Sequence, residues 1–165
     1  MKKFVVKTKN GFDVYVDMET SHAATHLQKH PNLFEIAKKI LSGCEVTSDE
    51  LRFETDTGVI VGDTDLVRTE EGDDVFYAKR PNREKYSRFV RGKKAATTTL
   101  VTIDVRKSGE GEYDLYTTYV GGIVPSFPTG KEDANYEQRQ FWATHALVAG
   151  NQDILSETVT TECPW

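Results

Sequence analysis

The chain has 165 residues, 38% of them hydrophobic and 28% charged, a balance typical of a globular protein rather than a disordered one. Its length fits one domain, and its longest apolar runs are far shorter than the roughly 20 residues that span a bilayer. The first residues lack the apolar core of a signal peptide, and Cys44 and Cys163 match no metal or redox spacing. We therefore expect a cytoplasmic protein with buried, reduced thiols and no membrane contact.

The N-terminal part predicts a hairpin followed by two helices. Residues 2–18 alternate apolar and polar side chains around Asn10-Gly11, a pair typical of a type I′ turn. The next segment predicts a short helix that ends at Pro31, because proline disfavours helical geometry at the residue before it. Apolar residues at helical spacing then predict a second helix over about 32–42.

Beyond residue 45 the pattern changes to short strands and turns. The clearest strand signals are the β-branched segments 97–107 and 113–122, which a polar turn separates. Residues 134–150 predict an amphipathic helix, and residues 154–161 a last strand.

This order of elements is typical of an α+β fold. The N-terminal hairpin and helices, residues 1–44, are expected to pack on a central antiparallel sheet that includes one late helix, residues 45–165. No repeat or linker interrupts the chain, so residues 1–165 are predicted to form a single domain.

The charge is unevenly distributed. Residues 79–94 hold one acid, Glu84, and eight basic residues: Lys79, Arg80, Arg83, Lys85, Arg88, Arg91, Lys93 and Lys94. This segment carries +7, so the rest of the chain carries −12 to give −5 overall. One concentrated basic segment in an acidic protein indicates a site for a polyanion such as RNA. A solvated charged surface without a ligand is the structural alternative.

Three of the four histidines, His22, His26 and His30, are spaced four residues apart and would share one face of an unbroken helix. Pro31 places His30 at the helix end, so the three imidazole rings are not expected to line up as ligands of a metal ion. The chain has no HExxH or CxxC pair, and we predict neither a metal site nor another cofactor. His145 is expected to pack behind the aromatic pair Phe141 and Trp142.

The remaining chemistry fits cleavage of RNA without a metal ion. That reaction needs a base for the ribose 2′-OH, an acid for the leaving oxygen and cations for the charge on phosphorus. Histidine suits the proton transfers, and the basic segment suits the phosphate. Thr117 and Tyr119 share one face of a strand and could orient the scissile group. The same residues also suit plain structural roles, on a helix surface and in a strand.

The order of these parts resembles the BECR-type ribonuclease superfamily, named for barnase, EndoU, colicin-type tRNases and RelE-like toxins. Five segments resemble an uncharacterised bacterial and phage-associated branch near those toxins: THLQKHPNL, VFYAKRPNREKYSRFV, LVTIDV, YDLYTTYVGGIVPSFP and FWATHALV. The likeness extends over about 22–150. It implies a metal-independent endoribonuclease that leaves a 2′,3′-cyclic phosphate, with RNA as its partner and a cognate antitoxin or immunity protein as a further one.

The resemblance also implies roles for single residues. The catalytic set would be His26 as general acid or base, Lys79 and Arg83 on the phosphate, and Thr117 and Tyr119 as orienting groups. The further RNA-binding residues would be Arg80, Lys85, Arg88 and Arg91. The competitors of His26 for its role are His22, His30 and His145. The alternative function is a non-catalytic accessory protein of a phage or mobile element that binds nucleic acid or protein.

Overall fold

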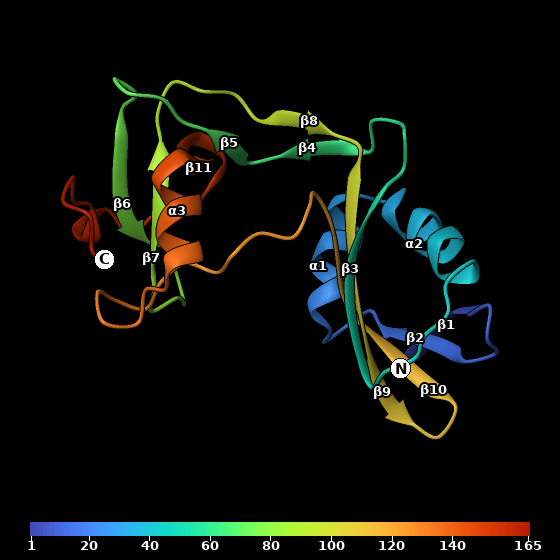
Figure 1. Ribbon diagram of the computed structural model, residues 1–165. Helices are drawn as coiled ribbons and strands as arrows, with labels where there is room; N and C mark the ends of the chain where they lie inside the picture. The colour runs from blue at the N-terminus through green and yellow to red at the C-terminus, as the bar shows by residue number, and fades with distance from the viewer. The chain divides into compact units, whose positions relative to one another are not determined.

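The computed structural model describes residues 1–165, and their contacts divide the chain into two compact units (Figure 1). Unit 1 comprises Met1–Asp63 and Thr97–Ile123, and unit 2 comprises Thr64–Ala96 and Val124–Trp165. The chain passes between the units three times, so neither unit is one continuous segment. Two of these passages fall within a two-stranded ribbon formed by β4 (Gly62–Thr64) and β8 (Ala96–Thr98).

Unit 1 is built on a five-stranded sheet with the strand order β1-β2-β10-β9-β3. Its strands are β1 (Lys2–Lys7), β2 (Asp13–Asp17), β3 (Glu50–Asp56), β9 (Leu100–Gly109) and β10 (Glu112–Val120). Two helices follow β2 in the chain, α1 (His22–Lys29) and α2 (Leu33–Ser42). The pairs are antiparallel except β2–β10, which is parallel and covers only residues 112–114 of β10. Beyond these residues β10 is contacted by α1.

The core of unit 1 lies between the two helices and one face of the sheet. It combines apolar side chains of α1 and α2 with alternate residues of the strands: Ala23, Leu27, Leu33, Ala37, Leu41, Val14, Val16, Val101, Ile103, Val105 and Leu115. All of them are nearly or fully inaccessible to solvent. Burial of this apolar surface is the main stabilising contribution of unit 1.

The start and end of α1 follow from single residues. Ser21 is the N-cap, and its Oγ accepts a hydrogen bond from the backbone N–H of Ala24 at 3.1 Å. Its backbone is extended, as is typical of a capping residue. At the other end His30, which precedes Pro31, has φ −125° and ψ 85° and leaves the helical region.

Replacing Ser21 with alanine is expected to destabilise the protein by about 0.5–2 kcal/mol, because the Ala24 N–H loses the Ser21 hydroxyl and keeps only the Ser21 carbonyl oxygen, at 3.2 Å, as an acceptor. The measurement is urea unfolding followed by circular dichroism. Thr25→Ala, at an exposed position of the same helix, is the matched control and should change the free energy of unfolding by no more than about 0.5 kcal/mol. An equal effect of both substitutions would contradict the capping role.

Unit 2 is built on a four-stranded sheet with the strand order β5-β11-β7-β6. Its elements are β5 (Leu66–Arg68), β6 (Val75–Lys79), β7 (Tyr86–Val90), α3 (Tyr136–Thr144), β11 (His145–Val148) and the short helices η1 (Ala149–Asn151) and η2 (Ser156–Thr158). β11 pairs antiparallel with β5 and parallel with β7. On one face of the sheet Phe76, Ala78 and Phe89 form a small core.

The α+β class is confirmed, but the sheets are mixed rather than antiparallel. The predicted N-terminal hairpin does not pack on a separate sheet, because β2 pairs with β10 and makes the hairpin part of the sheet itself. The predicted type I′ turn is also wrong. It requires a positive φ at both central residues, and only Gly11 has one, at +89°. The Asn10 side chain instead pairs with the backbone of Val46, at 2.7 and 3.1 Å.

Two further predictions fail near the C-terminus. The helix expected over 134–150 ends at Thr144, and the next four residues form β11, because this segment finds hydrogen-bond partners in two strands. The strand expected over 154–161 is the short helix η2 with a single bridge between Tyr77 and Thr160. The prediction that residues 1–165 form a single domain stays a prediction.

No helix is both long and apolar enough to cross a membrane. Cys44 and Cys163 are free thiols, and both are half-buried rather than buried.

Candidate functional site

Two histidines on α1 face the strand β10 within unit 1. The buried face of α1 consists of Ala23, Ala24 and Leu27, which places His22 and His26 at its border, one helical turn apart. His26 is half-buried, whereas His22 is exposed. His30 has left the helix, so it does not continue this row.

The His26 ring lies next to a tyrosine and an arginine. Its centroid is 5.7 Å from that of Tyr119 on β10. Nη2 of Arg52, on β3, donates a hydrogen bond to the Tyr119 hydroxyl at 3.1 Å, and the guanidinium lies 6.0 Å from the Tyr119 ring centre. One imidazole, one phenol and one guanidinium from three different elements therefore form a contiguous group.

A second group of the same composition lies one turn earlier on α1. The His22 ring is 5.0 Å from the Tyr116 ring, and the Arg106 guanidinium lies over that ring at 3.5 Å. Nε of Arg106 also forms an ion pair with Asp104, at 3.3 Å, and the Asp104 carboxylate raises the pKa of Arg106. Asp104 is only 3% exposed, so this ion pair holds Arg106 in place.

Strand pairing places Thr117 and Tyr119 on the sheet face opposite the core. Alternate residues of β9 over 101–105 point into the core, and Asp104 therefore points the other way. The register pairs both Arg52 of β3 and Thr117 of β10 with Asp104. Tyr119 lies two residues beyond Thr117 on the same face, as the alternation predicts. Thr117 is 9% exposed and is thus a nearly buried residue of this face.

The surroundings of His26 favour its neutral form. Burial lowers the pKa of His26, and the nearby positive charges of His30, Lys29 and His22 lower it further. A neutral imidazole at pH 7 can accept a proton, which is the state that a general base requires.

The basic segment belongs to unit 2 and forms a β-hairpin. Lys79 ends β6, residues 80–85 form the connection, and Arg88 lies within β7. The backbone of Asn82 adopts φ +60°, which asparagine tolerates better than most residues. The connection therefore presents Arg80, Arg83 and Lys85 close together in the chain at the hairpin tip.

The cations of this hairpin differ in what they contact. Arg91 pairs with Asp74 at 3.2 Å and lies over the Phe76 ring at 3.9 Å, and Arg88 donates to Thr69 at 2.8 Å. The other predicted cations form no salt bridge: Lys79, Arg80, Arg83 and Lys85. Nε of Arg80 is buried without a hydrogen-bond partner, and burial lowers the pKa of Arg80. Arg83 and Lys85 are exposed, so the hairpin tip presents at least these two positive charges to an anion.

The predicted site residues divide between the two units. Unit 1 holds His26, Thr117 and Tyr119, and brings them into one neighbourhood. Unit 2 holds all six predicted cations, Lys79, Arg80, Arg83, Lys85, Arg88 and Arg91. Sequence patterns did not indicate four further residues of this neighbourhood: Arg52, Asp104, Arg106 and Tyr116. In β3, Arg52 alternates with the apolar residues Leu51 and Phe53, so its side chain lies on the other face of the strand. This alternation is the one sequence signal that could have indicated Arg52 as a site residue.

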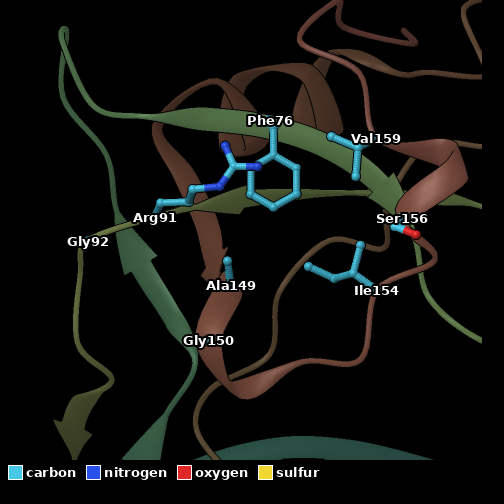
Figure 2. A pocket seen from close by; sticks show the side chains of 8 residues that line it. All are labelled: Phe76, Arg91, Gly92, Ala149, Gly150, Ile154, Ser156 and Val159. Carbon is cyan, nitrogen blue, oxygen red and sulfur yellow. The ribbon is translucent and has the colours of Figure 1, made fainter.

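A pocket of about 450 Å³ lies within unit 2 (Figure 2). Figure 2 shows the Arg91 guanidinium beside the Phe76 ring, with Ile154 and Val159 on the other side of the hollow. The lining has no histidine, cysteine or carboxylate, and therefore no group for acid–base chemistry near neutral pH.

His145 has a structural environment. Its ring stacks on Phe141, with the centroids 4.1 Å apart and the planes 4° from parallel. Its Nδ1 lies 3.0 Å from the Thr144 hydroxyl and 3.1 Å from the Phe141 carbonyl oxygen. The expected packing against Phe141 is confirmed.

No group of three or more His, Cys, Asp or Glu side chains is arranged to hold a metal ion. Comparison of the chain with protein-family models, with curated proteins and with solved structures finds no match.

Proposed function

We propose that the protein is a metal-independent endoribonuclease whose acid–base centre is His26 in unit 1. The observation that carries the proposal is the half-buried His26 ring with a lowered pKa, beside Tyr119 and Arg52. A neutral imidazole, a phenol and a guanidinium are sufficient to activate a ribose hydroxyl and to stabilise negative charge on a phosphate.

In the proposed reaction His26 takes the proton of the ribose 2′-OH. The 2′ oxygen forms a bond to phosphorus, the bond from phosphorus to the 5′ oxygen breaks, and water protonates the leaving oxygen. The products are a 2′,3′-cyclic phosphate and a 5′-hydroxyl. Arg52 stabilises the additional charge on the phosphate, while Tyr119 and Thr117 orient the scissile group.

The basic hairpin of unit 2 binds backbone phosphates in this proposal. Arg80, Arg83 and Lys85 suit that role because they form no salt bridge with the protein. In the proposed function the protein acts in the cytoplasm, with RNA as substrate and with an antitoxin or immunity protein as the partner that restrains it.

The test is incubation of the purified protein with a mixture of tRNA and messenger RNA in EDTA. We expect cleavage with 2′,3′-cyclic phosphate ends, which a 2′-deoxy substitution at the cleaved nucleotide abolishes because the nucleophile is missing. The measurement is gel electrophoresis with mass spectrometry of the ends. Products with 3′-hydroxyl ends, or loss of cleavage on chelation, would overturn the proposal.

A non-catalytic binding function is the second candidate, and the hairpin tip favours it. Arg80, Arg83 and Lys85 provide an anion-binding surface in a unit that lacks His26. In that case RNA binding would depend on these residues, and no cleavage would occur under any condition.

A further inference from the structure

The group formed by His22, Tyr116 and Arg106 has no part in the proposed reaction, and its geometry differs from that around His26. The Arg106 guanidinium lies 3.5 Å above the Tyr116 ring and is fixed there by Asp104. The side chain of Arg106 is still 39% exposed. One surface of the guanidinium plane is therefore covered by Tyr116, and part of the group faces solvent. Guanidinium planes and aromatic rings are the surfaces on which proteins stack unpaired RNA bases.

Arg106 also lines a hollow of about 780 Å³ within unit 1. The other residues of this hollow are Asp49, Glu50, Lys107, Gly109 and Glu110. Its three carboxylates outnumber its two cations, so it is unsuitable for a phosphate group. Carboxylates do accept hydrogen bonds from the exocyclic amino groups of bases. Glu50 is the nearest of them by strand register, since it pairs directly with Arg106.

The hollow shares Arg106 with the second group, and that group lies beside the proposed reaction centre. His22 precedes His26 by one helical turn, about 6 Å along α1. Tyr116 precedes Tyr119 by three residues on β10, and a β-bulge at Tyr116 turns its side chain out of the regular alternation. Along both α1 and β10, the group with His22 and Tyr116 therefore comes directly before the group with His26 and Tyr119. Two consecutive nucleotides of one RNA strand require such an arrangement if each is to contact one group.

We propose that Arg106 and Tyr116 bind the base next to the scissile phosphate, and that Glu50 selects a base with an exocyclic amino group. This inference rests on the proposed ribonuclease function and adds its substrate class, single-stranded RNA with an amino-bearing base beside the cleaved bond.

The test uses two five-nucleotide strands with 2′-O-methyl riboses, one of cytosine and one of uracil, which cannot be cleaved through the 2′ oxygen. The two strands carry the same charge and differ in whether the base bears an amino group. Fluorescence anisotropy gives their dissociation constants. We expect the cytosine strand to bind at least about fivefold more tightly.

Substitutions locate the effect. Glu50→Ala should abolish the preference for cytosine, whereas Glu54→Ala, four residues along the same strand, should keep it. Tyr116→Leu should weaken binding of both strands by roughly 5- to 100-fold, and Tyr116→Phe should restore it because the ring is kept. Circular dichroism of each variant confirms that it is folded.

Equal binding of the two strands by the wild-type protein, or unchanged binding by folded Tyr116→Leu, would overturn the inference. Binding that depends on Tyr116 in a protein that cleaves no RNA would support the base site and overturn the ribonuclease function. Cleavage that does not depend on Tyr116 or Glu50 would support the ribonuclease function and overturn the base site.

Discussion

Replacing His26 with alanine is expected to lower the rate of RNA cleavage by about 10²- to 10⁴-fold, the contribution typical of a positioned general base. The alanine leaves Tyr119 and Arg52 in place but removes the imidazole that lies beside them and is neutral at pH 7. The measurement is the single-turnover cleavage rate at saturating protein. Gln28→Ala, an exposed position two residues further along α1, is the matched control and should retain the wild-type rate.

The pH dependence of the same rate identifies the proton acceptor. Because burial lowers the pKa of His26, the cleavage rate should rise with pH through an apparent pKa below 6.5 and then level off. Folding stability should follow the same group. Between pH 6.5 and the lower pKa that His26 has in the folded state, the unfolded chain binds more protons than the folded chain. The free energy of unfolding therefore decreases as the pH falls through this range, and it keeps its full value above pH 6.5.

Two results would contradict this role. A His26→Ala variant that cleaves within about threefold of wild type would move the base to another residue, with His22 the nearest histidine on the helix. If the cleavage rate of the His26→Ala variant still rises with pH in the acidic range, the titrating group is not His26.

The half of the candidate site in unit 1 was partly predictable from the sequence because it depends on local geometry. Proline fixed the end of α1 and left His22 and His26 as the aligned pair. Alternation along β10 put Thr117 and Tyr119 on one face. Unbroken alternation would put Leu115 on this face too, but the β-bulge at Tyr116 turns Leu115 into the core.

What the sequence does not encode locally is which strands are neighbours. Arg52 contacts Tyr119, 67 residues away, because β3 and β10 both flank β9. The parallel pairs β2–β10 and β11–β7 join segments far apart in the chain, and no turn residue indicates them. The four residues HALV show why element type can fail too: they continue an amphipathic helix pattern, yet pairing on both edges makes them a strand.

Replacing Phe89 with alanine is expected to destabilise the protein by about 3–5 kcal/mol. Phe89 is fully buried and stacks on Phe76 with the ring centres 5.4 Å apart. Leu147 and Ile154 pack against the same cluster, so truncation leaves a cavity in the small core of unit 2. Urea unfolding measures the loss. Tyr136→Ala, at a position 79% exposed in the same unit, is the control and should cost no more than about 0.5 kcal/mol.

The same experiment tests whether the chain folds as a single domain. Both tryptophans, Trp142 and Trp165, belong to unit 2, whereas α1 and α2 of unit 1 contribute most of the helical circular dichroism. Because the chain passes between the units three times, we expect both signals to give one transition, shifted equally by Phe89→Ala. A shift of the tryptophan transition alone would show that unit 2 unfolds separately, and the centre around His26 would then survive in a chain whose basic hairpin is unfolded.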